Sequence, residues 1–157
     1  MKFKDFFCFE ATVPELQAND RDGVIDELVS SLYEQGKLGK GNKKNIIKAI
    51  IKRENEASTG MGKGVAVPHV KHKAVKDVVA VMGLSNVGID FFSLDKSPVH
   101  SIILLISPVN NPDKHLQAME NIFLHLQKEK FLKFLRQCTK SEQVKDLLVE
   151  ADEDPSL

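Results

Sequence analysis

Apolar residues recur with a helical period towards both ends of the chain. A four-residue spacing from Val24 to Leu32 predicts a helix over 20–35, and a second helix is predicted from a cap at Asn42 to about Ala57. Three further helices are predicted over 113–126, 129–137 and 141–149. The helical pattern therefore occupies the first third of the chain and the last third.

Short apolar runs in the middle of the chain predict strands. These strands are expected over 65–67, 77–84 and 99–106, with a turn and a further short strand over 86–90. The first strand is expected to stop at Pro68. The run Ile102–Ile106 is unbroken, as in a strand buried on both faces. This order of helices, strands and helices predicts a single α/β domain over 1–157, in which helices cover a mixed β-sheet. The acidic tail at 150–157 is expected to be frayed.

Composition narrows the function classes. The 157 residues are 42% hydrophobic and 28% charged, as in an ordinary globular domain. Lysine plus arginine number 22 and aspartate plus glutamate also number 22, which argues against a surface that coats nucleic acid. No apolar run approaches the roughly 18 residues that span a bilayer. We therefore expect no nucleic-acid partner and no membrane insertion.

The cysteines and the first residues indicate the compartment. Asp5 and Glu10 interrupt the apolar start, which makes it a poor signal peptide. Cys8 and Cys138 can in principle pair, but two scattered cysteines without an export signal favour free thiols. The sequence therefore predicts a cytoplasmic protein.

Arg53 is a cation on an apolar helix face. At about 100° per residue it lies within about 20° of Ile46, so it continues the apolar stripe of the second predicted helix. One interpretation is an arginine that extends from the helix end into solvent. The other is an anion ligand at the rim of the core, because a guanidinium offers paired donors to phosphate or carboxylate.

His115 shows the same pattern in the helix over 113–126. It lies in the first turn on the face of Met119, whereas His125 lies off that face and is expected to be solvated. A helix N-terminus favours a neutral imidazole, which can donate one hydrogen bond to an anion. The alternatives are a core histidine with its hydrogen bonds satisfied, and an N-cap at Asp113 that occupies the free amides.

His69 directly follows Val67 and Pro68 at a strand end. Proline stiffens the chain there, which suits a side chain that must be held for chemistry. Alternating glycines just upstream (60, 62 and 64) let a backbone approach a ligand or a partner, but they match neither the P-loop nor the dinucleotide fingerprint. His69 and His72 do not complete a four-ligand metal set, so we expect no metal and no other cofactor.

Two segments together resemble a known family. The stretch RENEASTGMGKGVAVPH, from Arg53 to His69, resembles the active-site segment of enzyme IIA domains of the fructose/mannitol class of the bacterial phosphoenolpyruvate-dependent phosphotransferase system. The stretch NPDKHLQAM, from Asn111 to Met119, is similar to the family's segment with the second active-site histidine. The resemblance covers nearly the whole chain, and the first segment is most similar to the nitrogen-regulatory branch.

The resemblance implies roles for three residues. His69 aligns with the histidine that is phosphorylated, His115 with the histidine that hydrogen-bonds the phosphoryl group, and Arg53 with an arginine near that site. It implies a phosphotransferase that accepts phosphate from an HPr-like phosphocarrier protein. Val70 departs from the glycine or alanine common after the phosphorylated histidine, which puts the choice of partner in doubt.

The resemblance leaves the output open. In the nitrogen-regulatory branch, phosphorylation changes binding to a regulatory protein. In a sugar-uptake enzyme IIA, the phosphate passes to a IIB domain. A third alternative is a protein-binding module that keeps the fold without phosphorylation, although the presence of all three site residues argues against it.

Overall fold

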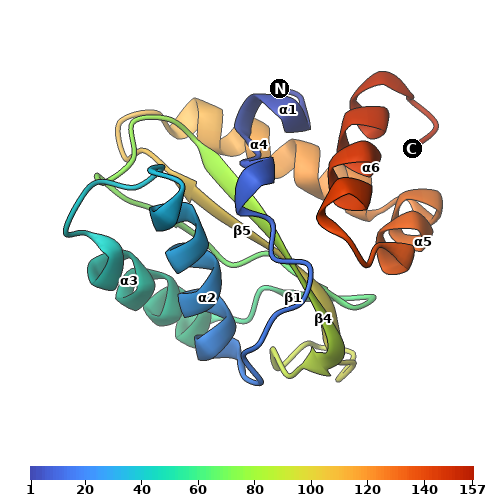
Figure 1. The fold of residues 1–157 in the computed structure, drawn as a ribbon, viewed down its shortest axis with the longest axis horizontal. Helices are drawn as coiled ribbons and strands as arrows, with labels where there is room; N and C mark the ends of the chain where they lie inside the picture. Colours follow the sequence, from blue (N-terminus) through green and yellow to red (C-terminus); the bar gives the residue numbers. More distant parts are fainter.

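The computed structural model describes all residues, 1–157. Its α-helices are α1 (Phe3–Phe6), α2 (Arg21–Glu34), α3 (Lys43–Glu56), α4 (Pro112–Leu126), α5 (Glu129–Gln137) and α6 (Ser141–Glu153), with a 3-10 turn, η1, at Phe9–Ala11. Its strands are β1 (Gly60–Gly62), β2 (Val65–Ala66), β3 (His69–Lys71), β4 (Val79–Ile89) and β5 (Val99–Ser107). This arrangement confirms the predicted α/β domain with a mixed sheet (Figure 1).

β5 is the central strand of the sheet. It pairs antiparallel with β4 on one side and parallel with β2 and β3 on the other, and β1 pairs antiparallel with β2. β4 runs without a break to Ile89, whereas the sequence predicts a turn and a separate short strand over 86–90. Gly88, with φ at +87°, accommodates the irregular pairing between Leu84 and Ile89 inside that one strand.

The first strand ends before Pro68, as the sequence predicts, and a second strand begins directly after the proline: β2 ends at Ala66 and β3 begins at His69. Ala66 lies opposite Ile102 and His69 lies opposite Leu105, so β2 and β3 keep one register across the proline. Proline lacks the N–H, but its carbonyl still accepts from the Leu105 N–H at 3.0 Å. His69 therefore belongs to a strand rather than to a loop that follows one.

Helices cover both faces of the sheet. Alternate residues of β4 and β5 point to opposite faces, so Met82 packs in one half of the core and Val81 in the other. The first half is closed by α1, α4, α5 and α6, and the second by α2 and α3. In Figure 1, α2 and α3 lie to the lower left of the β4–β5 ladder and α5 and α6 to its upper right.

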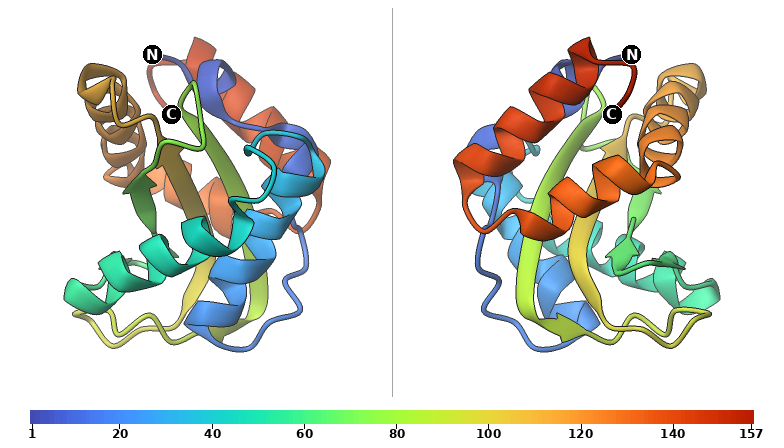
Figure 2. Two further views of the ribbon diagram at one scale, coloured as in Figure 1. Left: turned by 90° about the vertical axis from the view of Figure 1, so that its left-hand side faces the viewer. Right: turned by 90° about the vertical axis from the view of Figure 1, so that its right-hand side faces the viewer.

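Both termini are packed against the first half of the core. The segment around Cys8 and Val13 follows the outer edge of β4, with hydrogen bonds from Cys8 N to Ala80 O at 2.8 Å and from Val13 N to Met82 O at 3.0 Å. These bonds cover an edge that another strand would otherwise pair with. Figure 2 shows the two chain ends close together, beside α1 and α6.

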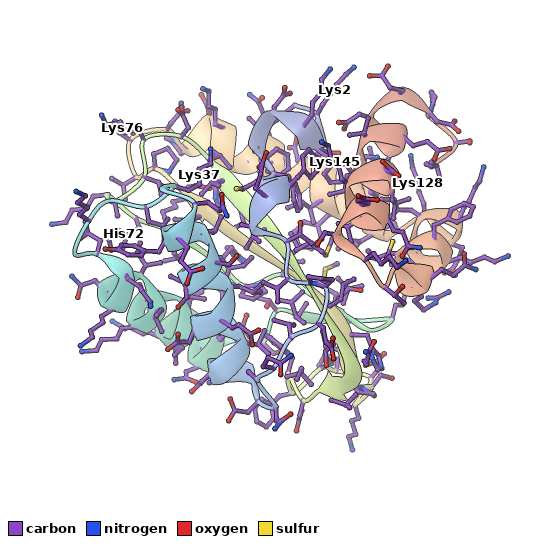
Figure 3. The ribbon with its side chains drawn as sticks, in the orientation of Figure 1. Lys2, Lys37, His72, Lys76, Lys128 and Lys145 are labelled. Atoms are coloured by element: carbon purple, nitrogen blue, oxygen red, sulfur yellow. The ribbon has the colours of Figure 1, made fainter.

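The acidic tail is packed in the structure, contrary to the expectation of fraying. Helix α6 continues to Glu153, and Leu157 is buried. Lys128, labelled in Figure 3, donates hydrogen bonds to the carbonyls of Pro155 and Leu157. The buried last residue and the lysine that precedes α5 hold the tail, and neither contact follows from the tail's own composition.

His125 is buried, whereas the sequence predicts a solvated side chain. Its ring lies 4.6 Å from that of Phe3 and 5.3 Å from that of Phe131, measured between centroids. Because α1 and α5 cover the flank of α4, this helix is buried over more than its apolar stripe. None of the helices is long and apolar enough to cross a membrane.

Candidate functional site

His69 begins β3 with one ring nitrogen already engaged. Its Nδ1 lies 2.9 Å from the backbone carbonyl oxygen of Val67. A carbonyl only accepts, so Nδ1 must carry the proton. In the neutral ring Nε2 then holds the free electron pair, which makes Nε2 a nucleophile in a fixed orientation.

The surroundings of His69 favour the neutral ring. Burial lowers the pKa of His69 below its ordinary value, and the charges of Arg53 and Lys71 lower it further. The bond to Val67 and the carboxylate of Glu54 oppose this shift without reversing it. The imidazole is therefore neutral at neutral pH, with its one proton on Nδ1, as a nucleophilic Nε2 requires.

His115 lies next to His69, as the sequence-based hypothesis requires. The centroids of the two rings are 5.8 Å apart. Its Nδ1 lies 2.6 Å from the hydroxyl oxygen of Ser107, at the end of β5. Burial lowers the pKa of His115, and the neighbouring His69 and Lys71 lower it further.

The first turn of α4 differs from one alternative in the sequence analysis. The N-cap is Asn111, whose side chain accepts from the Lys114 N–H at 3.3 Å, and Pro112 is the first helical residue. Asp113 lies inside the helix and does not cap it. The reason is local, because proline is favoured at the first helical position and asparagine immediately before it.

Arg53 lies in the last turn of α3, and α3 packs against β3. Its side chain is half-buried, and Nη1 donates to the Ala57 carbonyl at 3.1 Å. No hydrogen bond joins Arg53 to either histidine, but its charge is close enough to lower the pKa of His69. Its other N–H groups bind nothing within the chain and are available to an anion.

Glu54 is a site-building residue that the sequence analysis did not single out. It is only 3% exposed, and its carboxylate accepts from the N–H of Thr59 at 3.1 Å and from the Thr59 hydroxyl. These bonds fasten the loop before β1 to the end of α3. The sequence pattern that could have identified Glu54 is its spacing of four residues from Ile50, which places its carboxylate on the buried face of α3.

The alternating glycines have a structural role in the fold. Gly62, at the end of β1, and Gly64, in the turn before β2, have φ of +85° and +79°. A side chain at Gly60 would collide with Ser93, since a Cβ there would lie 2.1 Å from the Ser93 hydroxyl. These glycines therefore allow a tight hairpin to pack against the loop 91–98.

His72 takes a separate position from the two site histidines. Its Nδ1 accepts from the Ala74 N–H at 3.0 Å, which closes a short turn after β3. Figure 3 shows His72 near the start of α3, and Gly39, just before that helix, donates to the Ala74 carbonyl at 3.1 Å. No group of three or more His, Cys, Asp or Glu side chains is arranged to hold a metal ion.

The site thus brings together a neutral nucleophile, a second imidazole and a cation. An imidazole nitrogen can attack an electrophilic phosphorus, and the guanidinium and the second imidazole can bind the oxygens around it. Lys71 is exposed beside them and adds positive charge. This combination suits transfer of a phosphoryl group.

Comparison with known proteins supports this chemistry. Residues 6–151 match the family described as "Phosphoenolpyruvate-dependent sugar phosphotransferase system, EIIA 2". The chain is 29% identical to the fructose-specific EIIABC component of Bacillus subtilis over 152 residues, 97% of this chain and 24% of that protein. It therefore spans about a quarter of the length of that relative.

Two further proteins are similar over most of their length. A nitrogen regulatory protein of Bradyrhizobium diazoefficiens is 29% identical over 136 residues, 87% of each chain. The crystal structure of the nitrogen regulatory protein IIA-Ntr from Neisseria meningitidis superimposes with a TM-score of 0.82 at 22% identity, covering 92% of this chain and 97% of that one. The structural match confirms the fold.

Proposed function

Because the chain belongs to the EIIA type 2 family of the phosphoenolpyruvate-dependent phosphotransferase system, we propose that His69 is the residue that carries its phosphoryl group. Proteins of this family are components of protein-histidine phosphoryl transfer. The observation that carries the proposal is the bond from His69 Nδ1 to the Val67 carbonyl, 2.9 Å long, which leaves Nε2 free to attack.

The proposed donor is the phosphohistidine of an HPr-like carrier protein. The electron pair of His69 Nε2 attacks the phosphorus in line, and the bond from phosphorus to the donor's imidazole nitrogen breaks. The electron pair of that bond returns to the donor's imidazole, and the proton of His69 stays on Nδ1, hydrogen-bonded to the Val67 carbonyl. A cytoplasmic location is part of this proposal, because the chain must meet a carrier of that compartment.

Arg53 and His115 are proposed to bind the transferred group. Phosphoryl transfer has a loose transition state with negative charge on the three equatorial oxygens, so the protein contributes mainly position and donors. Arg53 has unused N–H groups, and His115 has its Nε2 unoccupied. Each charge-assisted hydrogen bond of this kind contributes about 1.5–3 kcal/mol.

For the output, we propose regulation of a partner protein by the phosphorylation state of His69. The nitrogen regulatory relative from Bradyrhizobium supports this, since its similarity covers most of both chains. A second candidate is transfer to a IIB domain for sugar uptake. The fructose-specific relative from Bacillus, which is similar over 97% of this chain, favours that alternative.

The first experiment measures whether His69 takes up phosphate. The protein is incubated with phosphoenolpyruvate, enzyme I and an HPr-type carrier, and its intact mass is measured at alkaline pH. We expect a gain of one phosphate that is lost on acid treatment, absent in His69→Ala and retained in His72→Ala, the matched control three residues away. A phosphate that persists in His69→Ala contradicts the assignment.

The second experiment separates the two outputs. A fructose-type IIB protein is added to the phosphorylated chain, and loss of the phosphate is followed by mass. Regulatory output predicts that the phosphate remains on the chain, whereas rapid discharge to the IIB protein establishes the sugar-uptake alternative. His115→Ala is expected to leave only some phosphorylation of His69 and to release that phosphate slowly to any acceptor.

A further inference from the structure

Ser107 occupies a fully enclosed position beside the site. It is the last residue of β5, and its exposed fraction is 0%. Its backbone carbonyl accepts from the His72 N–H at 2.8 Å, and its backbone lies opposite Lys71 in the parallel pairing of β3 and β5. The backbone of Ser107 is therefore fixed on the strand that also positions His69.

The hydroxyl of Ser107 has one hydrogen-bond partner, Nδ1 of His115, at 2.6 Å. If Nδ1 carried a proton and donated a hydrogen bond to the serine oxygen, the hydroxyl proton of Ser107 would be buried without an acceptor. If Ser107 donates instead, only a spare lone pair of its oxygen stays unpaired, which costs less than a buried unpaired O–H. The arrangement therefore favours donation from Ser107 to an unprotonated Nδ1.

We propose that Ser107 is a positioning residue that fixes His115 as the tautomer with its proton on Nε2. Nδ1 is occupied by the hydroxyl, so Nε2 is the ring nitrogen left to meet a ligand. A phosphoryl group presents only oxygen acceptors, and the Nε2–H tautomer is the neutral form that can donate to them. The consequence for phosphoryl transfer rests on the proposed role of His69, whereas the tautomer itself does not.

The two histidines are then set in opposite forms by their Nδ1 partners. Val67 offers a carbonyl, which accepts a hydrogen bond from His69 Nδ1–H and leaves Nε2 as the nucleophilic nitrogen. Ser107 offers a hydroxyl, which donates a hydrogen bond to His115 Nδ1 and leaves the ring proton on Nε2. One imidazole attacks phosphorus while the other binds a phosphoryl oxygen, and neither ring needs to change its protonation. The lowered pKa of His115 is consistent with a neutral ring, the only state in which a tautomer choice exists.

The test reads the tautomer directly on the unphosphorylated protein. Long-range proton–nitrogen NMR correlations of the histidine rings are recorded for the wild type, Ser107→Ala and Ser101→Ala, at a pH above the pKa of His115. Ser101 is the matched control, since it is also a buried serine of β5 but has no histidine bonded to its hydroxyl. We expect the Nε2–H form of His115 in the wild type and in Ser101→Ala, and a mixture of the two forms in Ser107→Ala.

The kinetic arm follows phosphate uptake from the HPr-type carrier in the same three proteins. We expect Ser107→Ala to accept phosphate severalfold more slowly, because a fraction of His115 no longer presents a donor, while Ser101→Ala is unchanged. An Nδ1–H form of His115 in the wild type overturns the proposal. So does an unchanged His115 spectrum, or an unchanged rate, in Ser107→Ala. If no carrier phosphorylates the wild type, the proposed role of His69 is contradicted. The NMR measurement still determines the tautomer of His115 in that case.

Discussion

At the scale of single residues, the site depends on what each side chain has next to it. His69 and His115 are chemically identical imidazoles, yet one faces a backbone carbonyl and the other a serine hydroxyl. Burial disfavours the charged form of both rings. The neighbouring groups, and not the imidazole itself, thus determine that each ring is neutral and which of its nitrogens is occupied.

This burial makes the stability of the protein depend on pH. Both pKa values are lowered in the folded protein from the ordinary value of 6.5, so the unfolded chain takes up protons first as the pH falls. The stability that the neutral rings contribute is complete above about pH 6.5 and decreases as the pH falls towards the folded pKa values. Urea unfolding across this range is expected to show a steeper loss for the wild type than for the double variant His69→Ala/His115→Ala. Parallel curves for the two proteins argue against this linkage.

Three candidate site residues could be singled out from the sequence because each interrupts a local pattern. Arg53 and His115 occur on apolar helix faces, and His69 follows a proline at a strand end. The partners of these residues could not be predicted in the same way. Ser107 reaches His115 only because β5 ends where α4 begins its first turn, and the Glu54–Thr59 contact depends on the fold of a loop.

At the scale of elements, long periodic segments could be predicted and short paired ones could not. α5 has the predicted bounds, and α2 and α4 begin and end within a residue of theirs. β1 and β3 are three residues each and exist through their pairing with other strands, which no local pattern encodes. Pro68 is the clearest case, because its missing N–H suggests a strand end while its carbonyl continues the pairing.

The contact between β1 and the loop 91–98 gives a prediction at this scale. Gly60→Ala introduces a Cβ that would meet the Ser93 hydroxyl at 2.1 Å and the Ser93 Cβ at 3.0 Å, so we expect a loss of about 1–3 kcal/mol of unfolding free energy. Ser93→Gly removes both atoms and leaves its Cα at 3.1 Å. In the Ser93→Gly background, Gly60→Ala is therefore expected to cost less than half as much by urea unfolding. If Gly60→Ala lowers the unfolding free energy equally in both backgrounds, the contact with Ser93 is not the cause of the loss.

At the scale of the whole molecule, the two ends of the chain are joined by a carboxylate. Asp152 of α6 accepts from the N–H groups of Phe3 at 2.7 Å and Lys4 at 3.0 Å, at the start of α1. A carboxylate at this position satisfies donors that a helix leaves unpaired at its first turn. It also holds the N-terminal segment that covers the edge of β4.

Asp152→Ala is expected to lower the free energy of unfolding by about 1–2 kcal/mol, since two hydrogen bonds to a half-buried carboxylate are lost. Phosphate uptake by His69 is expected to stay at the wild-type rate. The control is Glu150→Ala, an exposed residue of the same helix whose side chain makes no hydrogen bond or ion pair. Chemical unfolding and the mass assay measure the two effects, and equal stability of the two variants contradicts a stabilising role for Asp152.

The same contact has a consequence for the covalent order of the chain. With α1 against α6 and both ends on one side of the molecule (Figure 2), the backbone nearly closes into a ring. The peptide linkage between α5 and α6 at the exposed residues Thr139 and Lys140 then serves mainly as a tether. A circular permutant that is opened there and joined by a short linker between Leu157 and Met1 retains every contact of the sheet and of the histidine pair.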